Sequence, residues 1–481
     1  MPTLDSELTA MRILLVNTNR MKPACAPIGL DYIADSLTEA GFEPCVVDLC
    51  FSDDVRTDIR AAVRVFHPHL IGVTVRNTDE CYMSGAFFLP FVNEVIDCIR
   101  ECTDAPVVMG GVGFSVMPEA AMRFCRPDYG IAGEGEEAFP RFAKAIATRS
   151  GLEAVPSLLY WEQGALRRNT SEYAALGDLP RTRSFIDNAR YFREGGQAGF
   201  ETKRGCDMKC VYCADPVSKG RHVRFRSPKQ VVDELRALLA QGIDHFHTCD
   251  CEFNVPGDHA KAVCREIISA GIADRVRWYA YCSVTPFDEE MADLFKRAGC
   301  AGVDFGADSA DDDILKRLGR TFRREDLART AGLCHKHGIP FMYDLLIGGP
   351  GETRETVRRT IEFMRSIDAD CVGLSMGVRI YDGTPMADYV RSLGDVASNP
   401  DVYGAKEDNP DFMRPIFYVS PDLGENIANI VSELVAGDPR FFVPSREALD
   451  SNYNYNDNAV LVRAIADGAR GAYWDILRRM R

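Results

Sequence analysis

Three cysteines, Cys206, Cys210 and Cys213, lie close together in the stretch Thr202–Cys213. Their spacing, C-x3-C-x2-C, brings three thiolates around a cubane iron–sulfur cluster if the chain makes a tight loop, and Gly205 favours such a turn. Four cysteine ligands would close a cluster, whereas three leave one iron open to a substrate or cofactor. The triplet therefore predicts a reactive iron–sulfur centre.

Two other interpretations of the triplet stay open: a loop of buried thiols, or one half of a zinc site. Structural zinc sites usually pair two C-x2-C units, and this stretch contains only one. Cys249 and Cys251 flank Asp250, but two cysteines cannot complete an auxiliary cluster, and we interpret them as buried thiols. The cluster is the favoured interpretation.

The elements that would position this loop form two alternating series of strands and helices. In residues 11–150 the expected strands are 11–17, 42–48, 71–75, 106–109 and 128–132, separated by helical segments such as 28–40 and 86–102. This pattern predicts a doubly wound parallel sheet of Rossmann-like type, whose ligands lie beyond the carboxyl ends of the strands.

A second series begins near Gly199, after a linker at 151–197 that contains a small hairpin (157–161 and 165–168). Strands are expected at 199–202, 245–248, 277–281, 302–305, 341–347 and 371–377, with helices between them. Six such units predict a partial (β/α)6 barrel, with its site again at the carboxyl ends of the strands. The C-terminal region is expected to be small and mainly helical, and we interpret its tract Asp450–Asn458 as a capped helix entry.

With Tyr212 directly before the third cysteine, the triplet resembles that of the radical S-adenosylmethionine (radical SAM) superfamily. The resemblance implies that the three cysteines bind a 4Fe–4S cluster, whose open iron is chelated by the amino and carboxylate groups of S-adenosylmethionine (SAM). An electron from the reduced cluster would cleave the sulfonium to a 5′-deoxyadenosyl radical, which abstracts hydrogen from carbon. It also implies an external electron donor of flavodoxin or ferredoxin type.

Further segments resemble the superfamily in the right order, although each could also be an ordinary turn. The resemblance implies cofactor-binding roles near the methionine moiety, the ribose, the adenine and the sulfonium. The residues are, in chain order, Tyr212, Asp250, Glu252, Asp308, Ser309, Ile347 and Arg379.

A doubly wound domain before such a barrel resembles the cobalamin-dependent branch of the superfamily. The resemblance implies that strand-end residues of the first domain contact cobalamin, and small glycines would let backbone approach the corrin. These residues are Arg76, Gly110, Gly111, Gly133 and Glu134. No histidine lies in a D-x-H-x-x-G motif, so Arg76 is the candidate for the lower corrin face, with a strand-end ion pair as its alternative.

The expected domains are a cobalamin-binding domain at 1–150, a linker at 151–197, a radical SAM barrel at 198–400 and a C-terminal region at 401–481. The implied function is transfer of a methyl group from SAM, via methylcobalamin, to an unactivated carbon of a small molecule or peptide. The alternative is a non-methylating enzyme that catalyses cyclisation, ring contraction or another radical rearrangement. A non-catalytic sensor is a third hypothesis, but no signalling module is evident.

Composition and net charge further narrow the classes of protein to which the chain can belong. The chain has 481 residues, of which 46% are apolar and 26% charged, as in multi-domain globular proteins. A net charge of −15 argues against broad nucleic-acid or anionic-membrane binding. Seventeen cysteines without an export signal indicate a reducing cytoplasm, and no apolar run is long enough to span a membrane.

Overall fold

The computed structural model describes residues 11–83, 85–179, 181–444 and 457–481. The chain divides into two compact units, each described here by itself. The first unit comprises the residues up to Glu80, Ala86–Asp187 and Ala214–Gly220, and the second comprises Cys81–Gly85, Asn188–Cys213 and Arg221–Arg481.

The first unit is built on a seven-stranded sheet in the order β2-β1-β3-β4-β5-β6-β7. The five strands β1 to β5 are parallel, as the short apolar runs predict, and the hairpin β6–β7 extends the sheet antiparallel to β5. The order places β1 between β2 and β3, so the carboxyl ends of β1 and β3 form the switch point where ligands of such sheets bind. The strands are β1 (Arg12–Asn17), β2 (Glu43–Asp48), β3 (Leu70–Thr74), β4 (Val107–Gly110), β5 (Tyr129–Ile131), β6 (Leu158–Glu162) and β7 (Ala165–Arg168).

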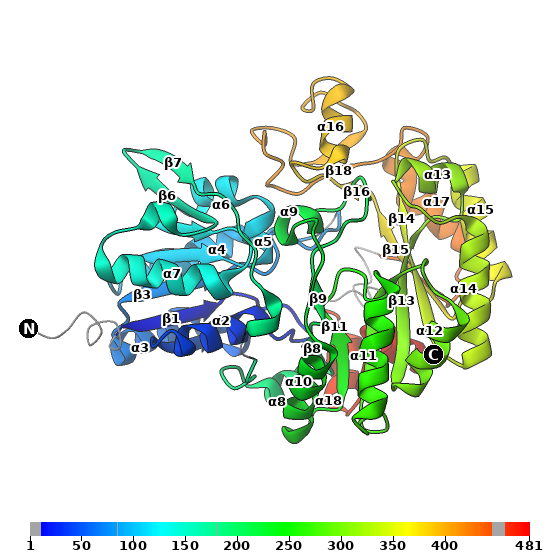
Figure 1. The fold of residues 1–481 in the computed structure, drawn as a ribbon. Helices are drawn as coiled ribbons and strands as arrows, with labels where there is room; N and C mark the ends of the chain where they lie inside the picture. The colour runs from blue at the N-terminus through cyan, green and yellow to red at the C-terminus, as the bar shows by residue number, and fades with distance from the viewer. Residues whose placement is uncertain (1–10, 84, 180, 445–456) are drawn as a thin grey trace, which may run out of the picture. The chain divides into compact units, whose positions relative to one another are not determined.

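Helices flank this sheet (Figure 1). α2 lies beside α7, while α3, α4 and α6 form a second row. The helices are α2 (Ile28–Glu39), α3 (Val55–Phe66), α4 (Leu89–Arg100), α5 (Val112–Val116), α6 (Pro118–Cys125), α7 (Gly135–Thr148) and α9 (Asp215–Lys219), with 3-10 turns η1 (Leu49–Phe51), η2 (Leu152–Ala154) and η3 (Leu176–Asp178).

The second unit contains an all-parallel sheet in the order β19-β15-β14-β13-β12-β11-β8. The six expected strands form, and a seventh, β19, joins at the edge of β15; its two residues are too few to give a periodicity signal. The strands are β8 (Ala198–Phe200), β11 (His245–Thr248), β12 (Arg277–Ser283), β13 (Cys300–Asp308), β14 (Phe341–Ile347), β15 (Cys371–Met376) and β19 (Phe441–Phe442).

Helices follow the strands of this barrel sheet in turn, with α10, α11, α12 and α14 forming a row on its outer side (Figure 1). The helices of the unit are α8 (Asn188–Gly195), α10 (Pro228–Ala240), α11 (Gly257–Ser269), α12 (Glu289–Arg297), α13 (Asp312–Arg317), α14 (Arg324–His337), α15 (Arg354–Ser366), α16 (Pro385–Ser392), α17 (Ile427–Val435), α18 (Ala459–Ala466) and α19 (Tyr473–Arg479). The remaining elements are β9 (Lys203–Arg204), β10 (Arg224–Phe225), β16 (Val378–Arg379), β17 (Val402–Gly404), β18 (Ile416–Tyr418) and η4 (Gly424–Asn426).

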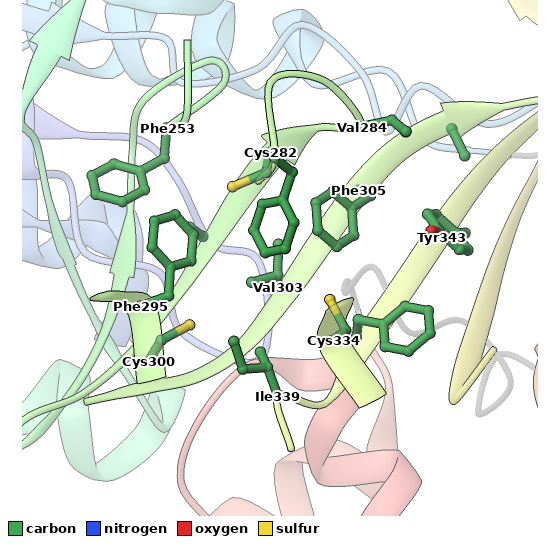
Figure 2. Packing of buried hydrophobic residues seen from close by; sticks show 14 of the residues in the cluster. Phe253, Cys282, Val284, Phe295, Cys300, Val303, Phe305, Cys334, Ile339 and Tyr343 are labelled. Carbon is green, nitrogen blue, oxygen red and sulfur yellow. The ribbon is translucent and has the colours of Figure 1, made fainter. Parts of the chain in front are cut away.

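The main core of the second unit lies between the barrel sheet and its helices. Figure 2 shows Cys282, Val303, Phe305 and Tyr343 of the strands in this core, near Phe295 of α12. Because successive strand residues point to opposite faces, the residues between these core positions lie on the inner face of the sheet, away from the helices. The alternation therefore decides which side chains line the inside of the barrel.

The C-terminal helices close one end of the inner face. Tyr279 of β12 donates a hydrogen bond of 2.8 Å from its hydroxyl to Oδ2 of Asp475 on α19. The Trp474 ring packs against Gly302, where a Cβ atom would lie 2.9 Å from it, so glycine makes room for the indole. Most of the Asp450–Asn458 tract lies outside the described residues, but Asn458 accepts from the Leu461 amide at 2.9 Å and caps α18 as expected.

Within the described part of the chain, every helix is too short or too polar to cross a bilayer.

The first prediction concerns the attachment of α19. In Tyr279→Phe the buried Asp475 loses one hydrogen bond, and we expect the opening free energy of α19 to fall by about 1 kcal/mol. Hydrogen exchange of the Tyr473–Arg479 amides should accelerate about fivefold. Tyr160→Phe on the β6 strand, which removes a hydroxyl from the first unit, is the control and should leave these amides unchanged; equal protection in both variants would contradict the expected role of Tyr279.

Candidate functional site

The three cysteines occupy a loop between β9 and α9 that backbone groups clamp from two sides. The Val211 amide donates to the Leu318 carbonyl at 3.0 Å, and the Met386 amide donates to the Val211 carbonyl at 2.9 Å. Gly205 has φ +91° and Gly319 has φ +79°, and a Cβ atom on either would lie 2.2 Å from a carbonyl oxygen. Only glycine allows both the left-handed backbone and this close approach.

The three thiols of the loop are the donor type that a cubane iron–sulfur cluster requires. Cys206 is buried, and burial raises the pKa of the Cys210 thiol to about 11. Because only the thiolate is a metal ligand, binding of a cluster would have to lower this pKa. No three Cys, His, Asp or Glu side chains converge on one ion position anywhere in the described ranges. In a cubane each thiolate binds a different iron, so three thiols that do not share one ion position still fit this donor set.

A buried guanidinium organises the polar groups beside the loop. Arg320 donates from Nε to Oδ2 of Asp308 at 2.5 Å and from Nη2 to the Tyr212 hydroxyl at 2.9 Å. The Tyr212 hydroxyl in turn donates to Asp308 at 2.8 Å. The Arg320 side chain is 4% exposed, and its Nη1 has no hydrogen-bond partner among the residues that the structure describes. Sequence reasoning missed Arg320, which lies in a loop with no motif of its own.

The two carboxylates after β11 differ in their surroundings. Asp250 accepts from the Thr202 amide at 2.8 Å and the Thr202 hydroxyl at 2.5 Å, so both of its oxygens hold the chain that leads into the cysteine loop. Glu252 lies with Oε1 3.7 Å from Nη1 of Arg320, and burial raises the pKa of this carboxyl to about 7. Glu252 is therefore the member of the pair oriented toward Arg320. We call Arg320 and its partners Asp308 and Tyr212 the Arg320 group.

The other predicted residues of the barrel have mainly structural contacts. Ser309 bonds Thr360 at 3.2 Å and accepts from the Asp311 amide, and Ile347 packs in the core between sheet and helices. The guanidinium of Arg379 donates to the Phe412 and Met413 carbonyls and lies 4.5 Å from the centroid of the Tyr381 ring.

Glu352, which the sequence reasoning did not select, shapes the loop after β14. The amides of Gly348 and Gly349 donate to its Oε2 at 2.6 and 3.2 Å, and burial raises its pKa to about 8. The sequence could have indicated this contact through the short spacing in Gly348-Gly-Pro-Gly-Glu352. A carboxylate so soon after two glycines can accept hydrogen bonds from their amides.

In the first unit the predicted glycines form two linked loops at the ends of β4 and β5. Gly111 has φ +100°, and a Cβ atom there would lie 2.5 Å from the Val75 carbonyl oxygen. The Ser115 hydroxyl donates to the Gly111 carbonyl and accepts from the Gly133 amide, both at 2.7 Å. Ser115 thus ties the loops together, a contact between separate strand ends that the sequence does not reveal.

At the same edge of the first sheet, the backbone of the loop after β5 is uncovered, so a flat ligand could approach it. Gly133 has φ +113°, and a Cβ atom placed on it would meet no atom of the described chain within 4 Å. The Glu134 carboxylate accepts from the Ala174 amide at 2.8 Å. Arg76 follows β3 at the switch point, and its Nη1 lies 3.5 Å from the Met21 sulfur. An open glycine loop beside a strand-end arginine fits the close backbone approach that a corrin ring requires.

Two family profiles match the chain. The profile of the Radical SAM superfamily matches residues 200–364, and that of the B12 binding domain matches residues 15–143. Their order agrees with the predicted architecture, a Rossmann-like sheet followed by a partial barrel, which is confirmed.

Relatives and solved structures span nearly the whole chain. Tryptophan 2-C-methyltransferase of Streptomyces laurentii is 33% identical over 96% of this chain and 95% of its own length. The radical SAM methyltransferase TsrM of Kitasatospora setae, solved with tryptophan and the SAM analogue aza-SAM, matches with TM-score 0.90 and 33% identity over 97% of both chains. TsrM solved with cobalamin and a [4Fe-4S] cluster matches with TM-score 0.89 and 31% identity over 98% of this chain and 97% of that one.

The second prediction tests the clamp on the cysteine loop. In Gly319→Ala the left-handed backbone alone costs about 1–2 kcal/mol, and the new Cβ atom must push the Lys209 carbonyl away. We expect iron incorporation after anaerobic reconstitution to fall clearly below that of the unmodified protein. Gly332→Ala, inside α14 with open space around the new atom, is the matched control and should keep full iron content. Unchanged iron in Gly319→Ala would show that the clamp is dispensable.

Proposed function

The chain belongs to the cobalamin-dependent radical SAM methyltransferases, and on that basis we propose that it methylates C2 of the indole ring of tryptophan or a close analogue. The observation that carries this proposal is 33% identity to a tryptophan 2-C-methyltransferase over nearly the full length of both chains. The non-methylating alternative is not favoured, because these full-length relatives are methyltransferases.

We assign the 4Fe–4S cluster to Cys206, Cys210 and Cys213. The support is the donor set of three thiols on a clamped loop, together with the cluster in TsrM. The cluster would supply an open iron for SAM, and the Arg320 group would line that position from the barrel side. Arg320 keeps Asp308 and Tyr212 in place, while Glu252 offers a carboxylate for a cationic part of SAM.

Asp250, Ser309 and Ile347 are assigned to the support of this site, because their polar atoms or side chains are engaged within the protein. Arg379 is assigned to the same region of the second unit through its contacts with the segment at Phe412 and Met413. An external electron donor of flavodoxin or ferredoxin type remains part of the proposal.

We assign cobalamin to the first unit, at the edge formed by Arg76, Gly110, Gly111, Gly133 and Glu134. Bound cobalamin would supply the carrier through which the methyl group passes from SAM to the acceptor carbon. The chain contributes open glycine backbone for close approach, Ser115 to hold two loops in register, and Arg76 at the switch point. We propose a cobalamin domain at 1–150, a barrel at 198–400 and a C-terminal region at 401–481. The linker at 151–197 contributes the hairpin β6–β7 to the first sheet.

The third prediction tests the reaction. Reconstituted protein with cobalamin, methyl-labelled SAM and tryptophan should yield 2-methyltryptophan that carries the label, identified by mass spectrometry and by loss of the C2 proton signal. Cys210→Ala should give no labelled product, because the cluster then lacks one ligand. Label on another atom of tryptophan, or no labelled tryptophan from fully reconstituted protein, would contradict the proposed acceptor.

The fourth prediction tests the cobalamin site with two matched glycines. Gly133 has φ +113° and Gly151 has φ +83°, and at both a Cβ atom would meet no described protein atom within 4 Å, so alanine strains the backbone at either position without a clash. Only Gly133 lies at the proposed site. We expect Gly133→Ala to weaken cobalamin binding about tenfold or more by steric exclusion, whereas Gly151→Ala should leave it unchanged; absorbance titration measures both. Equal affinities in the two variants would place cobalamin elsewhere.

A further inference from the structure

The inner face of the barrel sheet carries two acidic side chains that the proposed reaction has not used. Asp304 of β13 lies between Val303 and Phe305, which belong to the core on the helix side, so Asp304 lies on the inner face. Asp344 of β14 lies between Tyr343 and Leu345, which pack in the same core, and therefore shares the inner face. A carboxylate buried inside a barrel costs free energy unless a hydrogen-bond donor or a cation pairs with it.

Asp304 is not satisfied within the described chain. It is 2% exposed, and its Oδ1 has no hydrogen-bond partner there. Burial raises its pKa well above the usual value, and the two charges that act on it, Asp344 and Glu252, are both negative. A ligand group that brings N–H donors and a positive charge would relieve both deficits.

Three neighbouring side chains extend this polar region. Tyr281 pairs with Asp304 across β12 and β13, and its ring centroid lies 4.6 Å from that of His247, whose pKa burial lowers to about 4 so that the ring is neutral. Two residues further along these strands, Ser283 pairs with Gly306. The fully buried Ser283 hydroxyl has no hydrogen-bond partner in the described ranges. Carboxylate, aromatic rings and a free hydroxyl together suit an ammonium group.

The region is continuous with the site beside the cysteine loop. At Gly306, two residues after Asp304, a Cβ atom would lie 3.1 Å from Nη2 of Arg320 and 3.7 Å from Oε1 of Glu252. Because glycine stands there, residue 306 places no side chain between Asp304 and the Arg320 group. Asp304 therefore lies on the same face of β13 as Gly306, two residues from the backbone against which the Arg320 guanidinium packs.

We infer that Asp304, with Asp344 beside it, binds the α-ammonium group of the amino-acid substrate within the barrel. The inference rests on the proposed function and deepens it, because it separates recognition of the amino acid from recognition of the indole ring. An ammonium presents three N–H donors and a full charge, which matches a buried carboxylate with an unsatisfied oxygen next to a second carboxylate. The competing interpretations are a carboxyl pair that shares a proton without a ligand, and a carboxylate that binds the indole N–H.

The fifth prediction separates these interpretations with three compounds and reconstituted holoprotein. Tryptophan has both ammonium and carboxylate, tryptamine keeps only the ammonium, and indole-3-propionate keeps only the carboxylate. Equilibrium dialysis should show that the unmodified protein binds tryptophan and tryptamine and binds indole-3-propionate more weakly. Asp304→Asn should raise the Kd of the two ammonium compounds about tenfold or more and leave that of indole-3-propionate within about twofold.

Two further variants keep the test decisive. Asp344→Asn should show the same selective loss to a smaller extent, and it replaces Asp304→Asn if that variant does not fold. Asp370→Asn, whose carboxylate accepts from the Phe341 amide at the start of β14, is the control and should bind all three compounds normally. Equal losses for all three compounds in Asp304→Asn would indicate the indole N–H, and no loss would indicate a proton-sharing pair; either result overturns the inference. If the unmodified protein binds none of the three, the tryptophan assignment itself fails, and the inference with it.

Discussion

The protein depends on one backbone constraint, the clamp that holds the cysteine loop. Two left-handed glycines, Gly205 and Gly319, let carbonyl groups approach to distances that a Cβ atom would forbid. Hydrogen bonds of the Val211 backbone with Leu318 and Met386 then connect the loop with two segments far along the chain. Because three thiols on a flexible loop would lose much conformational entropy on binding a cluster, a loop that is already held in place makes binding more favourable.

The electrostatics of the second unit follow from an unequal number of buried charges. Arg320 is the cation that pairs with Asp308 and faces Glu252, whereas Asp304 has only carboxylates among the charges that act on it within the described chain. Burial makes each uncompensated carboxylate costly in free energy. The inner face therefore favours cationic ligand groups, and both SAM and an amino acid carry an ammonium.

The strand and helix order was predictable because each signal is local. The apolar runs of β1 and β14 and the glycine that ends α2 are visible in a few consecutive residues. Prediction failed where the local signal was weak. β19 has only two residues, and it forms a strand because it pairs with β15 at the edge of the sheet. The hairpin β6–β7 and the first sheet were both expected, but the addition of the hairpin to that sheet was not, because edge pairing depends on distant strands.

From the sequence alone, the two βα series predicted the architecture, and the cysteine spacing indicated the chemistry through its resemblance to the radical SAM superfamily, since both signals lie in short stretches of chain. The tertiary structure decided which groups stand beside those cysteines. Arg320 and Ser115 acquire partners from other strands or loops, whereas the sheet buries Asp304 with one oxygen unsatisfied among the described residues. The physical reason is that hydrogen bonding and desolvation depend on distances in space, and only the assembled sheets bring the ends of separate strands to those distances.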